Sequence, residues 1–161
     1  MANYSTPLLV APVSGSFKSA GVLWAGATAR RFQLYEAEFG QTGTLGTTDN
    51  QCQWDLSRIG NTVTLVGTTV ASALLDLADI ASLTLFLNNV TTEPCYTTAG
   101  NGLSVKSWAI NQRGSYRWRA LDDGDNIMVP AVAGNGLGIR MLSTLGLFTA
   151  SAVGGLSFIE R

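Results

Sequence analysis

Two copies of the pentapeptide Ala-Gly-Asn-Gly-Leu, at residues 99–103 and 133–137, are the first candidates for chemistry, because glycine-rich loops can cradle phosphate groups. A P-loop needs Lys and then Ser or Thr after its glycines, and a dinucleotide fingerprint needs a following helix. Neither copy has these features, since both continue into alternating strand-like residues. Asn-Gly tolerates positive φ at both central positions of a tight turn. We therefore predict that both copies are turns.

Acidic residues form a second set of candidates. The stretch Asp-Asp-Gly-Asp-Asn at 122–126 resembles part of a calcium loop, but the closing glutamate and the other ligands are missing. A turn is the better interpretation, because Asp and Gly are common turn residues. Asp76 with Asp79, and Glu36 with Glu38, are carboxylate pairs without any sign of the pocket that acid–base catalysis needs. These residues predict no metal site.

The chain contains no histidine, which removes Ser-His-Asp and Cys-His catalysis and every zinc site that needs an imidazole. Its two cysteines, Cys52 and Cys95, are too few for a structural zinc and do not form a Cys-X-X-Cys redox pair. They either form a disulfide with each other or remain two reduced, partly buried thiols. We expect no enzyme and no cofactor.

The stretch Tyr-Arg-Trp-Arg at 116–119 interleaves aromatic and basic residues, as single-strand nucleic-acid platforms do. On a strand, however, successive side chains point to opposite faces, so stacking and phosphate contacts would not share a face. We predict that the aromatic residues face the core and that Arg117 and Arg119 face solvent or a neighbouring subunit.

Composition limits the possible partners. The chain has 161 residues, which suits one domain, and a net charge of −1, which attracts neither nucleic acid nor an anionic membrane. Only 13% of its residues are charged, against about 25% in ordinary soluble domains. Either other chains cover part of its surface, or Thr, Ser, Asn and Gln cover it instead.

A run without charge from Met141 to Ile159 is long enough to span a membrane. Hydroxyl residues and the Gly154-Gly155 pair interrupt it, and its flanks are not basic, so two strands explain it better. The N-terminus has neither a basic segment nor a continuous apolar segment, and we expect no signal peptide.

Residues 1–28 lack both helical and clean strand periodicity, although they are apolar. We predict an extended N-terminal arm at 1–28, followed by one domain at 29–161. The arm lies either on its own sheet or on a neighbouring subunit, and the second is preferred. Deletion of residues 1–25 is then expected to leave a folded domain. The large apolar residues of the arm are Tyr4, Leu8, Leu9, Val10, Phe17 and Trp24.

From residue 30 onward, short alternating segments predict an all-β fold. The expected strands are 30–39, 51–59, 61–69, 82–90, 103–111, 114–121, 126–131, 136–144, 147–153 and 155–160. Residues 71–82 form either a short helix or a structured loop. The number and spacing of the strands favour a jelly-roll-like β-sandwich.

Three details of this pattern are specific enough to compare with a structure. A change of phase at Leu34 and Tyr35 predicts a β-bulge. Cys52, Trp54 and Leu56 should share one face. Leu83, Leu85 and Leu87 should face the core.

Five segments, in this order, resemble capsid decoration or cement proteins of tailed bacteriophages. They are ARRFQLYEAEFG (29–40), DNQCQWDLSR (49–58), TTEPCYT (91–97), AINQRGSYRWRALDDGDNIMVPA (109–131) and GNGLGIR (134–140). The similarity spans about Ala29 to Glu160, and its most specific parts are Asn-Gln-Arg at 111–113, Tyr-Arg-Trp at 116–118 and Pro130-Ala131.

The resemblance implies a head-stabilising jelly-roll protein that forms homotrimers on the capsid exterior and bridges major capsid protein subunits. It would be in the host cytoplasm only during assembly. The arm and the face around Arg113, Arg117 and Arg119 would contact neighbours. Two alternatives remain: a receptor- or glycan-binding head of a spike or fibre, using Trp108 or Tyr96, and a tail or neck component.

Overall fold

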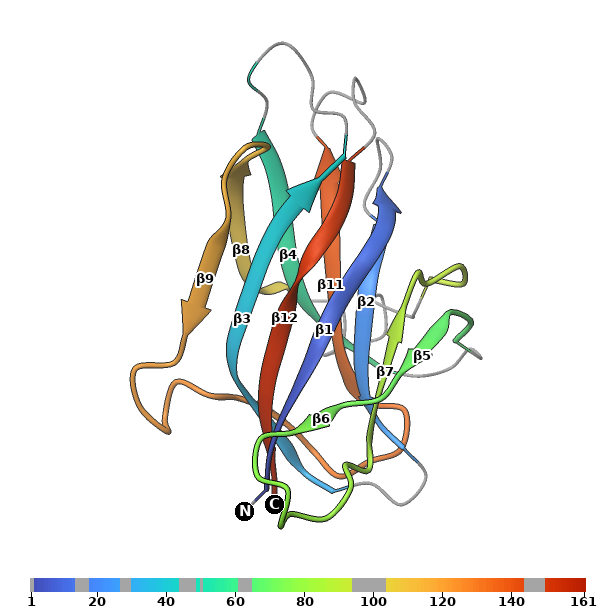
Figure 1. Ribbon diagram of the computed structural model, residues 1–161, viewed down its shortest axis with the longest axis vertical. Coiled ribbons are helices and arrows are strands. Elements are labelled where there is room, and N and C mark those ends of the chain that lie inside the picture. Colours follow the sequence, from blue (N-terminus) through green and yellow to red (C-terminus); the bar gives the residue numbers. More distant parts are fainter. Residues whose placement is uncertain are drawn as a thin grey trace.

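The computed structural model describes residues 2–13, 18–26, 30–43, 49, 51–60, 65–93, 104–143 and 150–161. The described residues form twelve β-strands and no helix (Figure 1). In chain order the strands are β1 (Ala2–Val13), β2 (Lys18–Ala25), β3 (Phe32–Thr42), β4 (Gln51–Ile59), β5 (Thr68–Val70), β6 (Ala73–Leu74), β7 (Thr84–Asn88), β8 (Ser104–Asn111), β9 (Tyr116–Arg119), β10 (Ile127–Val129), β11 (Gly136–Ser143) and β12 (Ala150–Glu160).

The strands form two antiparallel sheets that pack face to face. Sheet A has the order β10-β3-β12-β1-β6, and β9 pairs with β3 next to β10. Sheet B has the order β5-β7-β2-β11-β4-β8. In Figure 1, β3, β12 and β1 of sheet A lie in front of β4, β11 and β2 of sheet B. The predicted all-β sandwich is confirmed.

Strand pairing is nested from the chain ends inward. β1 pairs with β12, and β2 pairs with β11. β3 pairs with β9 and β10, and β4 pairs with β8. Consecutive strands lie in opposite sheets at β1 and β2, at β3 and β4, and at β11 and β12. The two ends of the chain therefore lie side by side (Figure 1).

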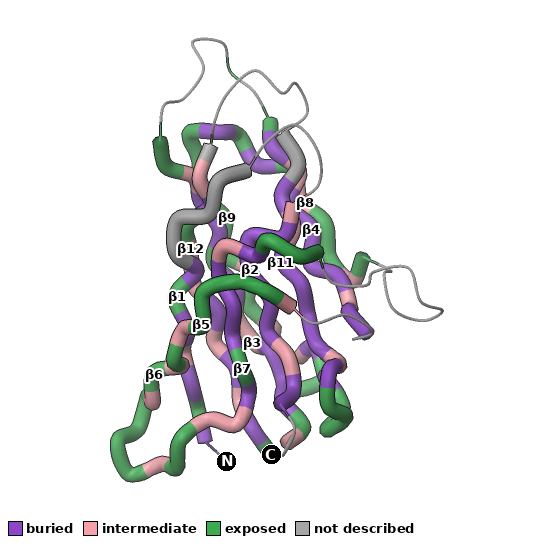
Figure 2. Tube along the Cα trace, turned by 90° about the vertical axis from the view of Figure 1, so that its right-hand side faces the viewer, coloured by how far each residue is buried: buried purple, intermediate pink, exposed green. Residues whose placement is uncertain are grey.

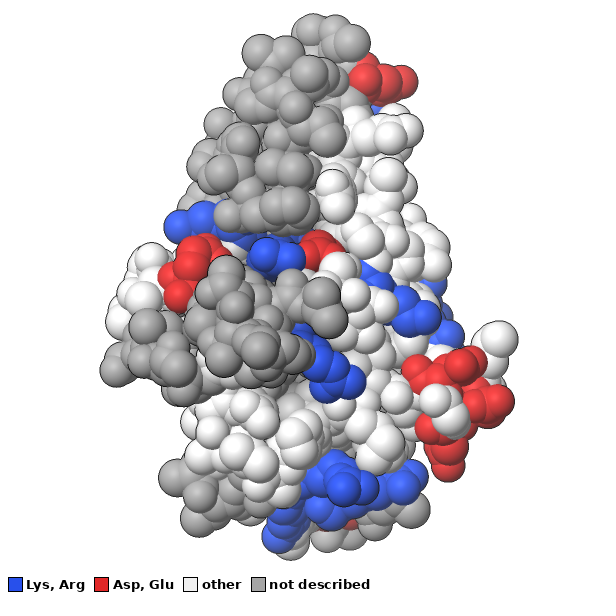
Figure 3. Space-filling view, turned by 180° about the vertical axis from the view of Figure 1, so that it is seen from behind, with Lys and Arg blue, Asp and Glu red and all other residues white. Residues whose placement is uncertain are grey.

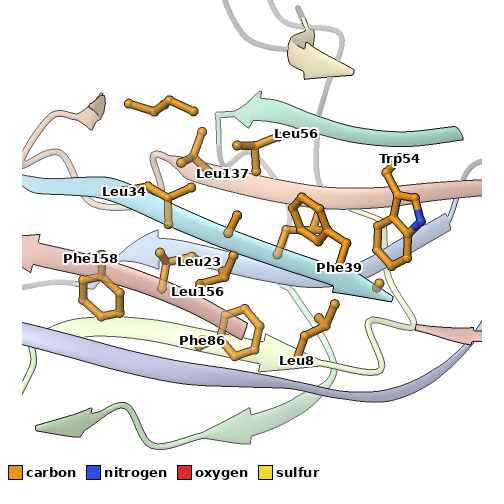
Figure 4. Close-up of a cluster of buried hydrophobic side chains, with 14 of the residues drawn as sticks. Leu8, Leu23, Leu34, Phe39, Trp54, Leu56, Phe86, Leu137, Leu156 and Phe158 are labelled. Atoms are coloured by element: carbon orange, nitrogen blue, oxygen red, sulfur yellow. The ribbon is translucent and has the colours of Figure 1, made fainter. Parts of the chain in front are cut away.

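The core lies between the two sheets and receives alternate side chains from each strand. Leu8 of β1, Leu156 and Phe158 of β12, and Trp54 of β4 are all at most 2% exposed. Figure 4 shows these side chains together, and Figure 2 shows buried residues along the central strands. The central strands are consequently fixed by apolar burial on their inner faces.

The prediction of an extended N-terminal arm is wrong. Residues 2–13 form β1 between β12 and β6, and residues 18–25 form β2 between β11 and β7. Tyr4 and Leu8 are buried in the core, where the Tyr4 ring stacks on Phe158 at 5.3 Å, and Trp24 is half-buried. The segment looked irregular because buried Thr6 and exposed Pro7 obscure its alternation. Phe17 and the side chains of Leu9 and Val10 lie outside the described residues.

Two local predictions in the first half of the chain are confirmed. The register between β3 and β12 shifts at Tyr35, because Ser157 lies opposite Glu36 whereas Phe158 lies opposite Leu34. Tyr35 is therefore the extra residue of a bulge. In β4, Cys52, Trp54 and Leu56 are fully buried in one cluster.

The predicted face of β7 is wrong. Phe86 points into the core, whereas Leu85 is 41% exposed and Leu87 is buried on the opposite side of sheet B. Gly21 of β2 explains this choice, because it leaves the space beside Phe86 that any Cβ would occupy. A second apolar cluster lies on the other side of sheet B, so both faces of β7 carry apolar residues and the sequence alone does not show which face is the core. The cluster consists of Val22, Ile59, Leu87 and Val90 with Trp24 and Leu65.

The loops differ from the predictions in detail. Residues 71–82 form the short β6 and a turn, so the loop alternative holds and the helix does not. The copy of the glycine phrase at 133–137 is a turn before β11, but the positive φ of 85° is at Gly134 and not at Asn135. The copy at 99–103 lies outside the described residues. The run from Met141 to Ile159 contains the last three residues of β11 and all of β12 except Glu160, so the prediction of two strands is confirmed.

Candidate interaction surface

β9 carries the arginine and aromatic residues that the sequence singles out, and it pairs with the edge of β3. The register places Arg117 opposite Glu38 and Arg119 opposite Glu36. The side chains of Arg117 and Arg119 are 60% and 69% exposed on the outer face of sheet A, whereas Trp118 packs against the core. The predicted division between the two faces is confirmed for these three residues, but the prediction that Tyr116 faces the core is wrong, because its side chain is 39% exposed. We call Arg117 and Arg119 the arginine edge.

Glu36 is the common partner of the arginine edge. Arg117 Nη2 lies 2.7 Å from Glu36 Oε1, and Arg119 Nε lies 3.8 Å from Glu36 Oε2. Glu36 itself is 17% exposed, but both arginines are mostly in solvent, and ion pairs of such exposed groups contribute only about 0–1 kcal/mol to stability. Because both arginine side chains are more than half exposed, their guanidinium groups retain hydrogen-bond donors in solvent.

Arg113 belongs to a separate ion pair in the turn between β8 and β9. Its Nε lies 2.9 Å from Asp49 Oδ1, and both side chains are at least half exposed. Its backbone N–H donates to Asn111 Oδ1 at 2.8 Å, which fixes the turn. Of the three arginines expected together, Arg117 and Arg119 share a carboxylate and Arg113 does not.

Aromatic rings run from the core to the surface between β8 and β9. Phe39 stacks on Trp54 at 5.0 Å and contacts Trp108 at 5.3 Å. Trp108 contacts Tyr116 at 5.5 Å, and Tyr116 is 39% exposed. The sequence could not predict this run, because its residues come from four strands in two sheets. On the same two strands, Lys106 Nζ lies 5.6 Å from the centre of the Trp118 ring.

The outer face of sheet A is uncharged along its two central strands. Directly opposed pairs include Asn3 with Ile159, Ser5 with Ser157, and Pro7 with Gly155. We call the outward residues of β1 and β12 the neutral strip. It comprises Asn3, Ser5, Pro7, Ser151, Val153, Gly155, Ser157 and Ile159.

An acidic loop, residues 75–80, follows β6 on the far side of the neutral strip from β9. Leu75, Leu77 and Ile80 are 56%, 91% and 56% exposed. The loop is held in place by the Leu75 N–H, which donates to the Asn3 carbonyl at 3.0 Å, and by the Tyr4 hydroxyl, which donates to the Ile80 carbonyl at 2.8 Å. Figure 2 shows this exposed segment beside β6. Leu75 and Leu77 are therefore surface residues of the loop, whereas Leu74 of β6 packs against the core.

A depression of about 340 Å³ lies between the acidic loop and the arginine edge. Its lining includes Tyr35, Leu75, Arg119, Leu121 and Ile159. Leu121 is 94% exposed. Asp122 and Asp123 also line the depression, so charges of both signs border its apolar side chains.

A second depression, of about 450 Å³, lies beside the chain ends and is lined by Arg30, Asp79, Ile80, Glu160 and Arg161, with Ala2 and Ala78. Figure 3 shows basic side chains gathered at one end of the face seen from behind. Glu160 itself is only 2% exposed. Its carboxylate is already used within the chain.

Glu160 fixes the segment that leads into β7. It accepts hydrogen bonds from Ser82 Oγ at 2.5 Å and from the backbone N–H groups of Leu83 and Thr84 at 3.0 and 2.7 Å. Burial would raise the pKa of Glu160, but these hydrogen bonds outweigh burial and lower its pKa. The carboxylate is a structural anchor.

Sheet B holds a buried ion pair that the sequence did not predict. Asp55 of β4 is 3% exposed and accepts hydrogen bonds from Arg140 of β11, Ser57 and Ser104. Arg140 also donates to Ser57 Oγ at 2.8 Å. Both Asp55 oxygens are occupied by neighbours, so the cluster stabilises the pairing of β4 with β11 and β8. Only the register, which places Asp55 opposite Arg140, reveals it.

Cys52 is a buried free thiol that donates to Gln41 Oε1 at 3.3 Å. Burial raises the pKa of the Cys52 thiol. Cys95, its possible disulfide partner, lies outside the described residues, as does Tyr96.

No group of three or more His, Cys, Asp or Glu residues among the described residues is arranged to hold a metal ion. None of the described residues belongs to a helix long and apolar enough to cross a membrane. Comparison of the chain with protein-family models, curated proteins and solved structures finds no match.

Proposed function

We propose that this chain is a structural virion protein of a tailed bacteriophage, bound to the outside of the capsid as a cement or decoration protein. In this role it is a homotrimer that bridges major capsid protein subunits and has no catalytic activity. It is made in the host cytoplasm and ends on the capsid exterior. Its partners are itself and the capsid protein, with no nucleic acid and no membrane.

The observation that carries the proposal is where the resembling segments lie in the fold. They supply β9 and β10, most of β3, β4 and β11, and the end of β8. β9 and β10 pair with β3, and β8 and β11 flank β4. Segments scattered in the sequence therefore form one side of the sandwich. The segment 91–97 is described only as far as Glu93.

Nested strand pairing supports the jelly-roll part of the proposal. A jelly roll wraps an antiparallel ribbon of strands over two sheets as two Greek keys. Pairing of β1 with β12, β2 with β11, β3 with β9 and β4 with β8 is compatible with such wrapping and supports this part of the proposal.

Stabilisation of a capsid by such a protein would be additive. Each copy adds apolar contact and hydrogen bonds across a junction between capsid subunits. Binding that favours the assembled state raises its stability by mass action, and many linked contacts act together. No chemical step is required, and the closed polar clusters around Asp55 and Glu160 are consistent with a structural role.

Immunogold electron microscopy of the phage particles that carry this gene tests the proposal. Label distributed over the head, together with greater heat resistance of heads that contain the protein than of heads that lack it, is the expected result. Label confined to the neck or tail would replace the proposal with the tail-component alternative. Particles without label would overturn a virion role.

A glycan-binding head is the second candidate, and the aromatic run favours it. Trp108 and the exposed Tyr116 lie in contact at the open edge between β8 and β9, close to the Lys106–Trp118 pair. Flat aromatic faces beside a polar group are typical of sugar-binding sites. Binding of the chain to a glycan array, lost on Trp108→Ala, would support this candidate over the capsid role.

A further inference from the structure

The depression of about 340 Å³ on the outer face of sheet A is built from distant parts of the chain. Three adjacent strands contribute to it, with Asn3 on β1, Ile159 on β12 and Tyr35 on β3. Leu75 of the acidic loop borders one side, and residues between 119 and 126, at and after the end of β9, border the other. Its volume lies within the range of small-molecule sites, about 300–1,000 Å³.

The β-bulge in β3 places Tyr35 on this face. Leu34 and Ala37 are both buried in the core, and the register shift leaves one extra residue between Leu34 and Glu36. Two consecutive side chains, those of Tyr35 and Glu36, therefore lie on the outer side of sheet A. Glu36 pairs with the arginine edge, whereas Tyr35 lines the depression. Bulges often redirect a side chain in this way beside a functional site.

Backbone hydrogen bonds hold both borders of the depression to the sheet. On one side, the Leu75 N–H donates to the Asn3 carbonyl at 3.0 Å. On the other side, the Ala120 N–H donates to the Tyr35 carbonyl at 2.8 Å. The depression is therefore formed without a ligand, so binding pays little for ordering the chain.

The depression presents hydrogen-bonding groups that the chain does not use. The Asn3 side-chain amide and the Tyr35 hydroxyl have no hydrogen-bond partner among the residues that the structure describes. Arg119 is 69% exposed, and its Nε lies 3.8 Å from Glu36 Oε2, beyond hydrogen-bond distance. Asp122 Oδ1 accepts the N–H of Gly124 in its own turn at 2.7 Å, which leaves Oδ2 as an acceptor. Donors and acceptors are thus both available.

The mixture of charges selects a neutral ligand. Arg119 repels a cation, and Asp122 and Asp123 repel an anion. A hydroxyl group avoids both problems, because it donates to a carboxylate and accepts from a guanidinium or amide group. Leu121 and Ile159 add apolar contact, which suits the C–H groups of a sugar ring.

We propose that this depression binds a neutral saccharide, with sugar hydroxyls on Arg119, Asn3 and Asp122. The inference goes beyond the capsid role, which requires no small ligand. The site is also separate from the aromatic run between β8 and β9, because neither Trp108 nor Tyr116 belongs to its lining.

A printed array of neutral and anionic oligosaccharides, probed with the full-length chain, tests the site. We expect the bound oligosaccharides to be neutral. Isothermal titration calorimetry with the neutral oligosaccharide that gives the strongest array signal then measures the Kd of wild type and variants. Arg119→Ala and Asn3→Ala should each raise this Kd about tenfold, because each removes hydrogen bonds to the sugar. Both side chains are exposed, and the thermal midpoint of each variant checks folding.

Arg117→Ala is the matched control for Arg119→Ala. Arg117 is on the same strand, is 60% exposed and pairs with the same Glu36, but it lies outside the lining of the depression. Its replacement should leave the Kd unchanged. Trp108→Ala should also leave the Kd unchanged, which separates this site from the aromatic run.

Three results would overturn the inference: an array on which no neutral oligosaccharide binds, a preference for anionic oligosaccharides, or neutral binding that Arg119→Ala and Asn3→Ala do not weaken. Binding that only Trp108→Ala abolishes would move the ligand to the aromatic run. None of these results changes where the protein is found on the particle, so the labelling of phage heads tests the capsid role independently.

Discussion

Phe39 of β3 and Trp54 of β4 stack with their ring centres 5.0 Å apart and their planes within 20° of parallel. The two residues belong to different sheets, so this contact joins the sandwich across its core. Trp54→Ala should destabilise the fold by about 3–5 kcal/mol, because a fully buried indole is replaced by a cavity. Chemical denaturation followed by fluorescence measures the loss.

Trp118→Ala is the comparison for Trp54→Ala. Trp118 is only half-buried and packs against the core from β9. Its truncation should therefore cost less than that of Trp54, about 1–2 kcal/mol. Equal losses for the two variants would show that the open edge between β8 and β9 is packed as tightly as the centre.

Gly154 and Gly155 are neighbours on β12 with opposite tolerance for a side chain. A Cβ on Gly154 would overlap the backbone carbonyl of Glu38, whereas a Cβ on Gly155 would lie 3.8 Å from its nearest neighbour, the Thr6 carbonyl. Gly154→Ala should cost about 1–3 kcal/mol or more, because backbone must move. Gly155→Ala should be nearly neutral. Thermal unfolding of both variants compares them, and equal midpoints would contradict the close approach of β12 to β3.

Deletion of residues 1–25 should abolish the fold. The deletion removes β1 from the middle of sheet A and β2 from the middle of sheet B, with Tyr4 and Leu8 from the core. Far-UV circular dichroism and the loss of a cooperative thermal transition check this result. A deletion variant that unfolds cooperatively would restore the interpretation of this segment as an arm.

Cys52 should be slow to react with a thiol reagent in the native protein. Its side chain is fully buried, and burial raises the pKa of its thiol, so little thiolate is accessible. Titration with Ellman's reagent in denaturant without reductant counts the free thiols. Two thiols per chain would mean that Cys52 and Cys95 are both reduced, and none would mean that they are bonded. Rapid labelling of Cys52 in native buffer would contradict its burial.

Alternation of apolar and polar residues predicts features that lie within a single strand, such as which side chains face the core and where a bulge occurs. It predicts the shared face of Cys52, Trp54 and Leu56 and the bulge at Tyr35, because both follow from a period of two and a change of phase. It fails at β7, where a second apolar cluster on the outer side of sheet B makes both faces apolar. It also fails at β1, where only pairing with β12 shows that Tyr4 points inward.

The candidate surface depends on register and topology, which a single sequence does not contain. Arg117 and Arg119 are predicted to face outward, but nothing near them in the sequence indicates Glu36 as their common partner. The acidic loop follows a two-residue strand and was as compatible with a helix. Its position across the neutral strip from β9 follows only from the order of strands in sheet A.

Glu160 should make the stability of the fold depend on pH in acid. Its pKa is lowered in the folded chain, so the ionised carboxylate stabilises the fold above the pKa that it has when unfolded, about 4.3. This stabilisation is lost as the pH falls through the lower folded-state pKa. Glu160→Gln should cost about 2 kcal/mol at neutral pH, because hydrogen bonds from Ser82, Leu83 and Thr84 to a charged acceptor are weakened. Urea denaturation from pH 7 to pH 3 should show that the difference in free energy of unfolding between wild type and Glu160→Gln shrinks below about pH 4.3.

Glu38→Gln, at an exposed position on β3, is the control and should change stability little at any pH. A difference for Glu160→Gln that stays constant over this range would mean that the side chain acts through its shape and not through its charge.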